Sequence, residues 1–267
     1  MRHIMQHFAR QHALKQRIRS GQPTCGLFIK IPAPQIIELM AAADFDFLVL
    51  DAEHAPFGVD RLDSCLLAAR AVEIPVLVRV PDHHPSHIQN ALDLGAAGVI
   101  IPHITSAQDA GAAVSAATYR QGRRGFAASH RAARYGALTA DAYREASDNS
   151  TIIIGQIEDA AAVDAIDQIA AIPGLDALFI GCADLAVSYG FNLSDTSRLE
   201  HPVRTICEAG RTQQKTLGIF LPDLGQVADW HAKGISLYFI ASDQTLLTRA
   251  ADNLSAAFKD AFASKNP

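Results

Sequence analysis

The sequence has 267 residues, of which 49% are hydrophobic and 19% are charged, with a formal net charge of −5 and a pI of about 6.1. This length suits one large α/β barrel or two smaller domains, and the apolar content is enough for a substantial core, which argues against disorder. The acidic balance provides no basic face, so no nucleic-acid partner is expected.

The chain begins with a stretch, residues 1–20, that is rich in His, Arg and Gln and is predicted to form a leading helix. It lacks the continuous apolar segment of a secretory signal. No apolar run elsewhere reaches the roughly 18 residues that a membrane span requires. The four cysteines are far apart and form no CxxC pair, which is typical of buried thiols in a reducing compartment. We therefore expect a cytoplasmic protein without a membrane partner.

After the leading helix, short apolar segments alternate with segments of helical pattern. Strands are predicted at 24–30, 47–50, 74–80, 98–101, 151–157, 177–180, 217–220 and 236–240. Helices are predicted at 34–43, 59–72, 86–94, 106–117, 140–146, 160–171, 202–214, 226–232 and 243–263.

This alternation predicts the fold class. Parallel neighbours need a crossover helix, and each gap between the predicted strands has one, which favours a (β/α)8 TIM barrel over a doubly wound sheet. No GxGxxG motif follows the first strand, so a dinucleotide site is not indicated. We expect a single domain, 1–267, with an extra N-terminal helix (1–20) and a long C-terminal helix (243–263).

The second predicted strand ends in three ionisable residues, Asp51, Glu53 and His54. In parallel α/β sheets the carboxyl ends of the strands carry the chemistry. If the turn curls back, the Asp51 carboxylate can fix the tautomer of His54 and leave its other ring nitrogen as a base. The alternative at this stage is a polar loop in which Asp51 caps the next helix.

Two carboxylates, Glu158 and Asp184, follow the fifth and sixth strands. On adjacent strands they are a minimal site for a hard divalent cation, because Mg²⁺ commonly takes one or two carboxylates and fills its octahedron with water and substrate oxygens. The alternatives are that Glu158 is a carboxylate at a helix N-terminus and that Asp184 caps a short turn.

Other polar residues end the neighbouring strands. Arg79 closes the third strand, where its planar fork suits a carboxylate or an enolate oxygen, although a structural ion pair is the alternative. His103 follows the fourth strand, and Gln156 lies in the fifth. Cys182 is interpreted as a packed thiol, because no base adjoins it.

A long Gly- and Arg-rich stretch interrupts the alternation at 120–135, and a loop of this length is usually functional. Its arginines fit either an anion-binding patch or ion pairs at a subunit interface, and the second interpretation is slightly favoured. They are Arg123, Arg124, Arg131 and Arg134.

The ordered motifs resemble a known family. They are 45–56, which contains Asp51-Ala52-Glu53-His54; Val78-Arg79-Val80-Pro81; 95–102; the loop with Arg123-Arg124-Gly125, Arg131-Ala132 and Tyr135-Gly136; Gln156-Ile157-Glu158; and 174–185. The sequence is similar, from about Gly26 to the final helix, to the class II pyruvate aldolases typified by 4-hydroxy-2-oxoheptanedioate aldolase, which are related to the citrate lyase β-subunit.

The resemblance implies a (β/α)8 barrel that assembles as a homo-oligomer, a hexamer or a trimer, with the last helix exchanged between subunits. It implies Mg²⁺, Mn²⁺ or Co²⁺ held by Glu158 and Asp184. Arg79 would bind the 2-oxo acid, Gln156 and the backbone near Ala183 would hold pyruvate, and His54, oriented by Asp51, would serve proton transfer at the aldehyde oxygen.

Three positions depart from the family pattern: Ala52 replaces a Gly, Cys182 replaces a Pro, and His103 replaces a more common Met. If the replaced Gly has positive φ, Ala52 would be strained. Cys182 would loosen its loop, and His103 adds a titratable group near the mouth.

The predicted function is a metal-dependent aldolase that forms or cleaves 4-hydroxy-2-oxo acids from pyruvate and an aldehyde. Lys30 is the nearest lysine to a strand end, so a Schiff-base enzyme is less favoured. Two alternatives stay open: a CoA-thioester lyase of the related branch, and a catalytically weak barrel that binds metabolites.

Overall fold

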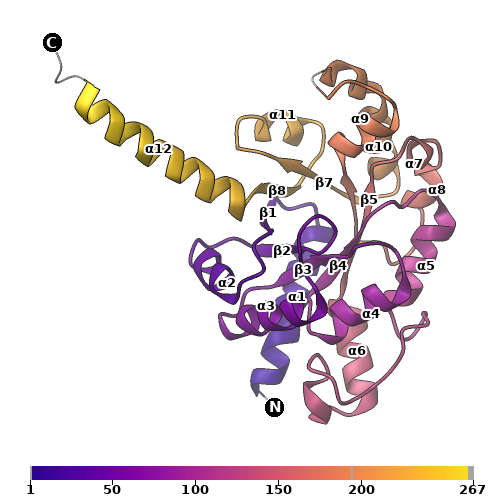
Figure 1. Cartoon of the computed structure of the whole chain (residues 1–267). Helices are drawn as coiled ribbons and strands as arrows, with labels where there is room; N and C mark the ends of the chain where they lie inside the picture. Colours follow the sequence, from indigo (N-terminus) through magenta and orange to yellow (C-terminus); the bar gives the residue numbers. More distant parts are fainter. Residues whose placement is uncertain (1, 194, 264–267) are drawn as a thin grey trace.

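The computed structural model describes residues 2–193 and 195–263 and shows a closed barrel of eight parallel strands that pair in chain order, β1 to β8 (Figure 1). The predicted (β/α)8 barrel is therefore confirmed. The strands are β1 (Thr24–Ile29), β2 (Phe47–Asp51), β3 (Val76–Arg79), β4 (Gly98–Ile101), β5 (Ile152–Ile157), β6 (Ala177–Ile180), β7 (Thr216–Leu221) and β8 (Leu237–Ser242).

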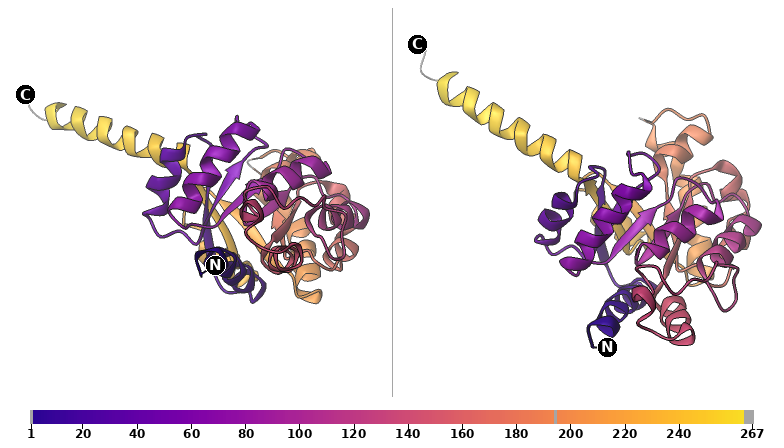
Figure 2. Two further views of the ribbon diagram at one scale, coloured as in Figure 1. Left: turned by 90° about the horizontal axis from the view of Figure 1, so that it is seen from below. Right: turned by 60° about the horizontal axis from the view of Figure 1, so that its bottom comes forward.

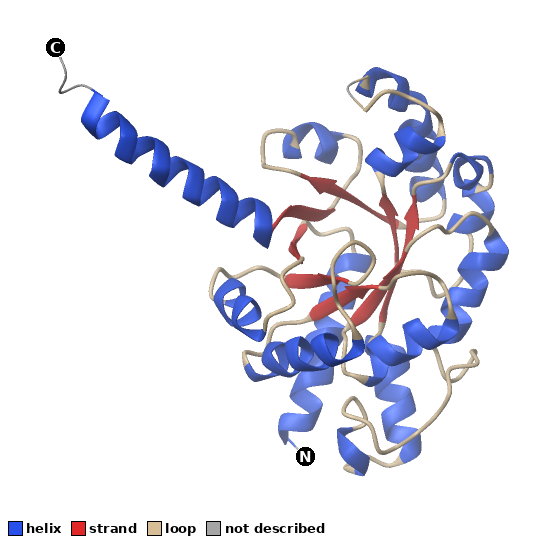
Figure 3. Ribbon diagram, viewed as in Figure 1, coloured by secondary structure: helices blue, strands red, loops and turns tan. Residues whose placement is uncertain are grey.

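Helices surround the strands, as Figure 3 shows. The α-helices of the first half are α1 (Arg2–Arg19), α2 (Pro34–Ala41), α3 (Val59–Ala71), α4 (Pro85–Asp93), α5 (Ala107–Ala117) and α6 (Ala140–Ser150). Those of the second half are α7 (Ala160–Asp164), α8 (Ile166–Ala170), α9 (Cys182–Ser188), α10 (Glu200–Thr212), α11 (Val227–Ala232) and α12 (Asp243–Ala263). Two 3-10 turns are η1 (Arg134–Gly136) and η2 (Thr196–Leu199).

Two of these helical segments differ from the prediction. The segment predicted as one helix at 160–171 is divided into α7 and α8, because Ala165 leaves helical geometry with φ −100° and ψ 8°. Helix α9 directly follows β6 in a segment that the sequence pattern had placed in a strand-end loop. The predicted metal residue Asp184 therefore lies in the first turn of a helix.

Successive residues of β2 face opposite sides of the barrel wall, and both sides are dry. Phe47 and Val49 pack in the barrel interior, whereas Leu48 and Leu50 pack against the surrounding helices. A strand buried on both faces needs an unbroken apolar run, which explains why 47–50 contains no polar residue.

Aromatic rings fill the barrel interior. Phe179 and Phe239 have ring centroids 4.5 Å apart, and Phe28 lies 5.6 Å from Phe239. Gly26 makes room for Phe47, because a Cβ there would lie 2.3 Å from the Phe47 ring. The interior is thus a packed core, and only the strand ends are left for chemistry.

Helix α1 covers the amino ends of the strands, as both views in Figure 2 illustrate. Its residues Leu14 and Ile18 join the cluster inside the barrel. The ammonium of Lys15 donates to the carbonyl of Thr151 (2.6 Å) and lies 3.4 Å from Asp176. The leading helix therefore closes one end of the barrel and leaves the carboxyl ends accessible.

Helix α12 extends away from the barrel (Figure 1). Its first residue, Asp243, is fully buried and accepts the backbone N–H groups of Lys30 and Ile31, both at 2.9 Å. Farther along, Leu254, Phe258 and Phe262 are exposed. In the described part of the chain, no helix combines the length and apolar character needed to cross a membrane.

Candidate active site

The interior-facing rows of the barrel end in polar side chains. In β2 the row runs Phe47, Val49 and then Asp51, whose register partner in β3 is Arg79. In β5 the row ends at Gln156, after Ile152 and Ile154. Strand alternation alone therefore brings these polar residues to the carboxyl end of the barrel.

Asp51 and Arg79 form a bidentate ion pair. Nε of Arg79 donates to Oδ1 of Asp51 (2.9 Å) and Nη2 donates to Oδ2 (2.8 Å), while Lys30 Nζ lies 3.4 Å from Oδ2. Burial opposes ionisation of Asp51, but the hydrogen bonds and charge of Arg79 hold its pKa below the ordinary value. The guanidinium also lies over the ring of Phe28, 5.0 Å from its centroid. The fork of Arg79 is thus fixed in orientation.

Glu53 lies beside this pair. Its Oε2 is 3.1 Å from Nη1 of Arg79, within ion-pair distance but without hydrogen-bond geometry, and this buried oxygen has no hydrogen-bond partner among the described residues. Burial raises the pKa of Glu53 to about 7; Arg79 opposes this shift and the charge of Glu158 adds to it. Glu53 is therefore an under-compensated carboxylate.

Glu158 follows β5 and is almost completely buried. The side-chain amide of Gln156 donates to its Oε2, and the backbone N–H of His103 donates to its Oε1 at 2.8 Å. Gly181 allows this arrangement, because a Cβ at that position would lie 2.8 Å from Cβ of Glu158. The carbonyl oxygen of the Gln156 side chain is buried without a described hydrogen-bond partner.

His103 completes the group from the end of β4, where its backbone adopts a left-handed φ of 53°. Its Nε2 is 3.7 Å from Oε1 of Glu53, and its Nδ1 is 3.5 Å from Oε1 of Glu158 and 3.1 Å from Oδ2 of Asp159. Partial burial lowers the pKa of His103, but the nearby carboxylates, with Asp159 first, raise it above the ordinary value overall.

Ligand atoms of Glu53, His103 and Glu158 all lie within 4.8 Å of one another, an arrangement that could hold a metal ion. The chemistry of the set fits a divalent cation: two carboxylates and an imidazole are ordinary ligands, and the buried oxygens Oε2 of Glu53 and Oε1 of Gln156 have no hydrogen-bond partner among the described residues. Neither Glu53 nor His103 was predicted as a metal ligand. Their positions after the ends of β2 and β4 are the sequence feature that could have indicated this role.

The structure brings only part of the predicted set together. Glu158 belongs to the group, whereas Asp184 and Ala183 are exposed in the first turn of α9, and Asp184 is not part of this three-residue group. The predicted roles of Asp184 and Ala183 stay predictions.

The arrangement of Asp51 and His54 also differs from the one expected. Oδ1 of Asp51 accepts the backbone N–H of His54 (3.2 Å), while the half-exposed ring has its Nε2 3.7 Å from Oε2 of Glu53. Asp51 thus fixes the turn rather than the imidazole. Ala52 is absent from the positive-φ residues of the described chain, so the strain considered for it does not arise.

The arginine-rich loop contributes internal ion pairs. Buried Arg124 pairs with Asp93 at 2.6 Å, and Arg131 pairs with Asp63 at 2.7 Å.

At Cys182, burial raises the pKa of the thiol to about 11, so the thiol is neutral at pH 7.

Comparisons with known proteins identify the family. The sequence model described as HpcH/HpaI aldolase/citrate lyase matches residues 24–250. The chain is 32% identical over 251 residues to the 5-keto-4-deoxy-D-glucarate aldolase of Salmonella paratyphi C (strain RKS4594), covering 92% of this chain and 96% of that enzyme.

Solved structures of similar proteins have the same fold. A family protein from Burkholderia cenocepacia J2315 has a TM-score of 0.87 at 32% identity, covering 93% of this chain and 99% of that one. The citrate synthase SbnG has a TM-score of 0.82 at 30% identity, covering 92% and 97%.

Proposed function

Because this chain belongs to the HpcH/HpaI aldolase/citrate lyase family and is an enzyme of the lyase class, we propose that it is a metal-dependent pyruvate aldolase. It would form or cleave 4-hydroxy-2-oxo acids from pyruvate, or another 2-oxo acid, and an aldehyde. The observation that carries this proposal is the group of Arg79, Glu53 and Glu158 at the barrel mouth, in which a guanidinium of fixed orientation lies beside two carboxylates and the pKa of Glu53 is raised to about 7.

A divalent cation (Mg²⁺, Mn²⁺ or Co²⁺) would be held by Glu158, with Glu53 and His103 as the donors nearest to it and Asp184 as the second carboxylate that the sequence motif proposes. When bound, the cation supplies a Lewis acid that stabilises the negative charge of an enolate.

Arg79 would receive the oxygen atoms of the 2-oxo acid. Asp51 holds its guanidinium through two hydrogen bonds and so fixes the direction of the fork before the substrate arrives. Because the fork is already oriented, it does not have to move when negative charge develops on the enolate oxygen. Gln156 and the backbone near Ala183 and Asp184 would complete the contacts of pyruvate.

His54 would move the proton at the aldehyde oxygen. Its ring is accessible at the mouth, and its Nε2 lies 3.7 Å from Oε2 of Glu53. A neutral imidazole can accept the proton of the 4-hydroxyl group in cleavage and return it in the aldol direction. In this proposal Glu53, rather than Asp51, is the group that the imidazolium faces.

A retro-aldol assay coupled to pyruvate detection tests the proposal. The metal-depleted enzyme, the same enzyme with Mn²⁺ added back, and Glu158→Gln are each offered a panel of 4-hydroxy-2-oxo acids. Pyruvate release that depends on both the metal and Glu158 supports the proposal. Turnover of a CoA thioester alone, or substrate binding without turnover of any acid, would replace it by one of the two alternatives.

We also propose that α12 is exchanged between subunits of a homo-oligomer, a hexamer or a trimer. Its anchored first residue and its exposed apolar side chains support this, because a helix with an apolar stripe needs a partner surface. The whole chain, 1–267, would then be one barrel domain that lends its last helix to a neighbour.

A further inference from the structure

A pocket lies at the opposite end of the barrel from the candidate active site. It is bounded by α1, by the end of α3 and by the η1 turn, and we call it the basal pocket. Ile74 and Pro75 line it immediately before β3 begins, whereas Arg79 ends the same strand at the mouth. The two sites are therefore separated by the length of the barrel.

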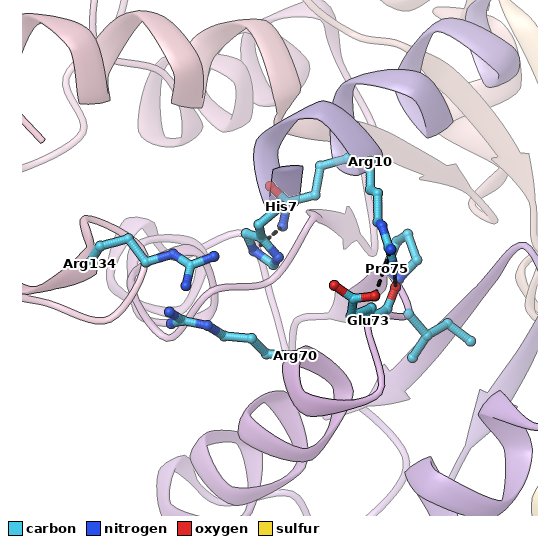
Figure 4. Close-up of a pocket in the computed structure, with 8 residues that line it drawn as sticks. His7, Arg10, Arg70, Glu73, Pro75 and Arg134 are labelled. Carbon is cyan, nitrogen blue, oxygen red and sulfur yellow. Dashed lines mark hydrogen bonds and ion pairs between the residues drawn. The ribbon is translucent and has the colours of Figure 1, made fainter. Parts of the chain in front are cut away.

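Three arginines and one carboxylate give the basal pocket its charge: Arg10, Arg70, Arg134 and Glu73. Glu73 is already neutralised, because Nη2 of Arg10 lies 2.6 Å from its Oε2 and Nη1 donates to its backbone carbonyl at 2.9 Å. Arg70 and Arg134 have no ion-pair partner among the described residues. Their side chains both point into the pocket (Figure 4).

Both unpaired arginines are half-buried. Burial and the nearby charge of Arg131 lower the pKa of Arg70, which indicates an electropositive, poorly hydrated environment. Arg131 itself is occupied by Asp63. Placing like charges together at a partly dry site without a counter-charge is unfavourable, so the arrangement calls for an anion.

His7 adds a neutral donor. The side-chain amide of Gln11 donates to its Nε2 (3.0 Å), which places the ring proton on Nδ1. Burial is the largest of the causes that lower the pKa of His7 to about 4, so the ring is uncharged at neutral pH. A neutral imidazole N–H can donate a hydrogen bond to an anion without adding to the crowding of positive charge.

The backbone that presents Arg134 is unusual. Arg134 and Tyr135 have φ values of 55° and 54°, in the left-handed region that residues with a side chain rarely adopt. Backbone hydrogen bonds hold this turn, from the N–H of Tyr135 to the carbonyl of His130 (3.2 Å) and from Ala137 to Arg134 (3.2 Å). Strained turns of this kind cluster at ligand-binding positions.

We propose that the basal pocket binds a small phosphate-type dianion through the guanidinium groups of Arg70 and Arg134. Guanidinium forks match the geometry of phosphate oxygens, and the pocket volume of about 160 Å³ suits inorganic phosphate or the phosphate group of a monoester. The bound anion links α3 and the η1 turn through these two arginines, and the N–H of His7 on α1 can donate a third contact that fastens the helix closing the barrel.

Equilibrium dialysis of the full-length protein with radiolabelled inorganic phosphate, at constant ionic strength, tests the proposal. We expect Arg70→Gln and Arg134→Gln each to weaken binding at least tenfold, and Arg70→Lys to weaken it less. Arg61→Gln is the matched control, because Arg61 is an exposed arginine of the same helix outside the pocket. Competition by glycerol 3-phosphate distinguishes the sources: stronger competition than by unlabelled phosphate identifies a monoester as the ligand.

Thermal unfolding supplies a second readout. Without phosphate, Arg70→Gln should melt at or above the temperature of the wild type, because it relieves like-charge crowding; with phosphate, only the wild type and Arg61→Gln should gain stability. Phosphate binding that survives in Arg70→Gln and Arg134→Gln, absence of binding to the wild type, or a loss of subunit assembly in these variants would each overturn the proposal.

Discussion

Arg79 is held between two carboxylates of different character. Asp51 is fully buried and ionised, with its pKa depressed, whereas Glu53 has a pKa raised to about 7. Asp51 fixes the orientation of the guanidinium. Glu53, which is partly protonated near neutral pH, balances only part of the positive charge on the other side. The same arginine can thus be rigid and still receive an anionic substrate, which is the property that an enolate-binding residue needs.

The first prediction concerns the fork of Arg79. Arg79→Lys keeps the charge but cannot make both hydrogen bonds to Asp51, so we expect kcat to fall by roughly 10²–10³-fold, as for loss of an oxyanion donor. Steady-state pyruvate release measures this. Arg61→Lys, on the exposed side of α3, is the control and should leave the rate unchanged. Equal rates for Arg79→Lys and the wild type would return Arg79 to a purely structural role.

A second prediction separates the possible metal donors. Glu158→Gln should abolish tight binding of Mn²⁺, which calorimetry on the metal-depleted protein measures without reference to turnover. His103→Ala and Asp184→Asn then decide the remaining donors: the structure favours a larger loss for His103→Ala, and the sequence motif favours a larger loss for Asp184→Asn. Unchanged affinity in Glu158→Gln would mean that the ion binds elsewhere.

The third prediction concerns the relative effects of substitutions at Asp51 and His54. If Asp51 only oriented His54, Asp51→Asn would cost less activity than His54→Ala. In the structure Asp51 neutralises buried Arg79, so Asp51→Asn should also destabilise the fold, by about 3–5 kcal/mol, as breaking a buried pair does. His54→Ala should keep its stability, lose cleavage by roughly 10²–10⁴-fold and retain exchange of pyruvate methyl protons. Urea unfolding and the two rates give the comparison, and a fully stable Asp51→Asn would contradict it.

At the scale of elements, the prediction from sequence succeeded where periodicity is strong. Runs such as 47–50 and 98–101 are apolar throughout because both faces of the strand are buried, and their bounds were found to within a residue. Strand alternation also carries Asp51, Arg79 and Gln156 to one mouth, so their convergence followed from the strand ends alone.

The hydrophobic periodicity could not predict the direction of the side chains that follow the strands. His103 reaches Glu53 and Glu158 only because its own backbone is left-handed, and Asp184 lies on α9, a short helix that has no strong pattern of its own. Likewise, the choice of Arg79 rather than His54 as the partner of Asp51 depends on the register of β2 and β3. These are tertiary facts that a local sequence window does not contain.

The fourth prediction concerns the docking of α1 and of the long loop. His7 on α1 has its pKa lowered to about 4, and burial also lowers the pKa of His130, whose ring packs on Tyr143. Between pH 6.5 and 4 the unfolded chain therefore binds a proton at His7 that the folded chain does not. The contribution of His7 to stability should be complete above pH 6.5 and be lost as the pH drops towards 4, by up to about 1.4 kcal/mol per pH unit, whereas the raised pKa values of Glu53 and His103 act in the opposite direction.

Urea unfolding of the wild type and of His7→Gln at pH 7, 6 and 5 checks this, because the contributions of Glu53 and His103 are common to both proteins and cancel in the difference. Relative to the wild type, His7→Gln should gain stability as the pH falls from 7 to 5, whereas His201→Gln, at an exposed histidine of α10, should follow the wild type. An identical pH dependence in His7→Gln would show that His7 does not couple the docking of α1 to pH.

Across the whole molecule, the candidate active site and helix α12 lie on different parts of the fold. The polar group at the mouth is built from β2 to β5, α1 closes the opposite end, and α12 departs from β8 with its start fixed by Asp243. Since Leu254, Phe258 and Phe262 are spaced four residues apart, they form one stripe along a helix that lies free of its own barrel. In the proposed exchange of α12, this stripe would contact another copy of the chain.

The last prediction tests this contact. The double variant Leu254→Asp with Phe258→Asp places two charges in the stripe, and burying them against a neighbour would be strongly unfavourable. We expect light scattering to show a wild-type oligomer and, for the variant, a mass close to the 28.6 kDa of one chain. Asn253→Asp adds a charge one residue away from the stripe and should leave the assembly intact. The candidate active site lies on the strands and not on α12, so metal binding should persist in the separated variant; an oligomer that survives both charges would show that subunits associate through another surface.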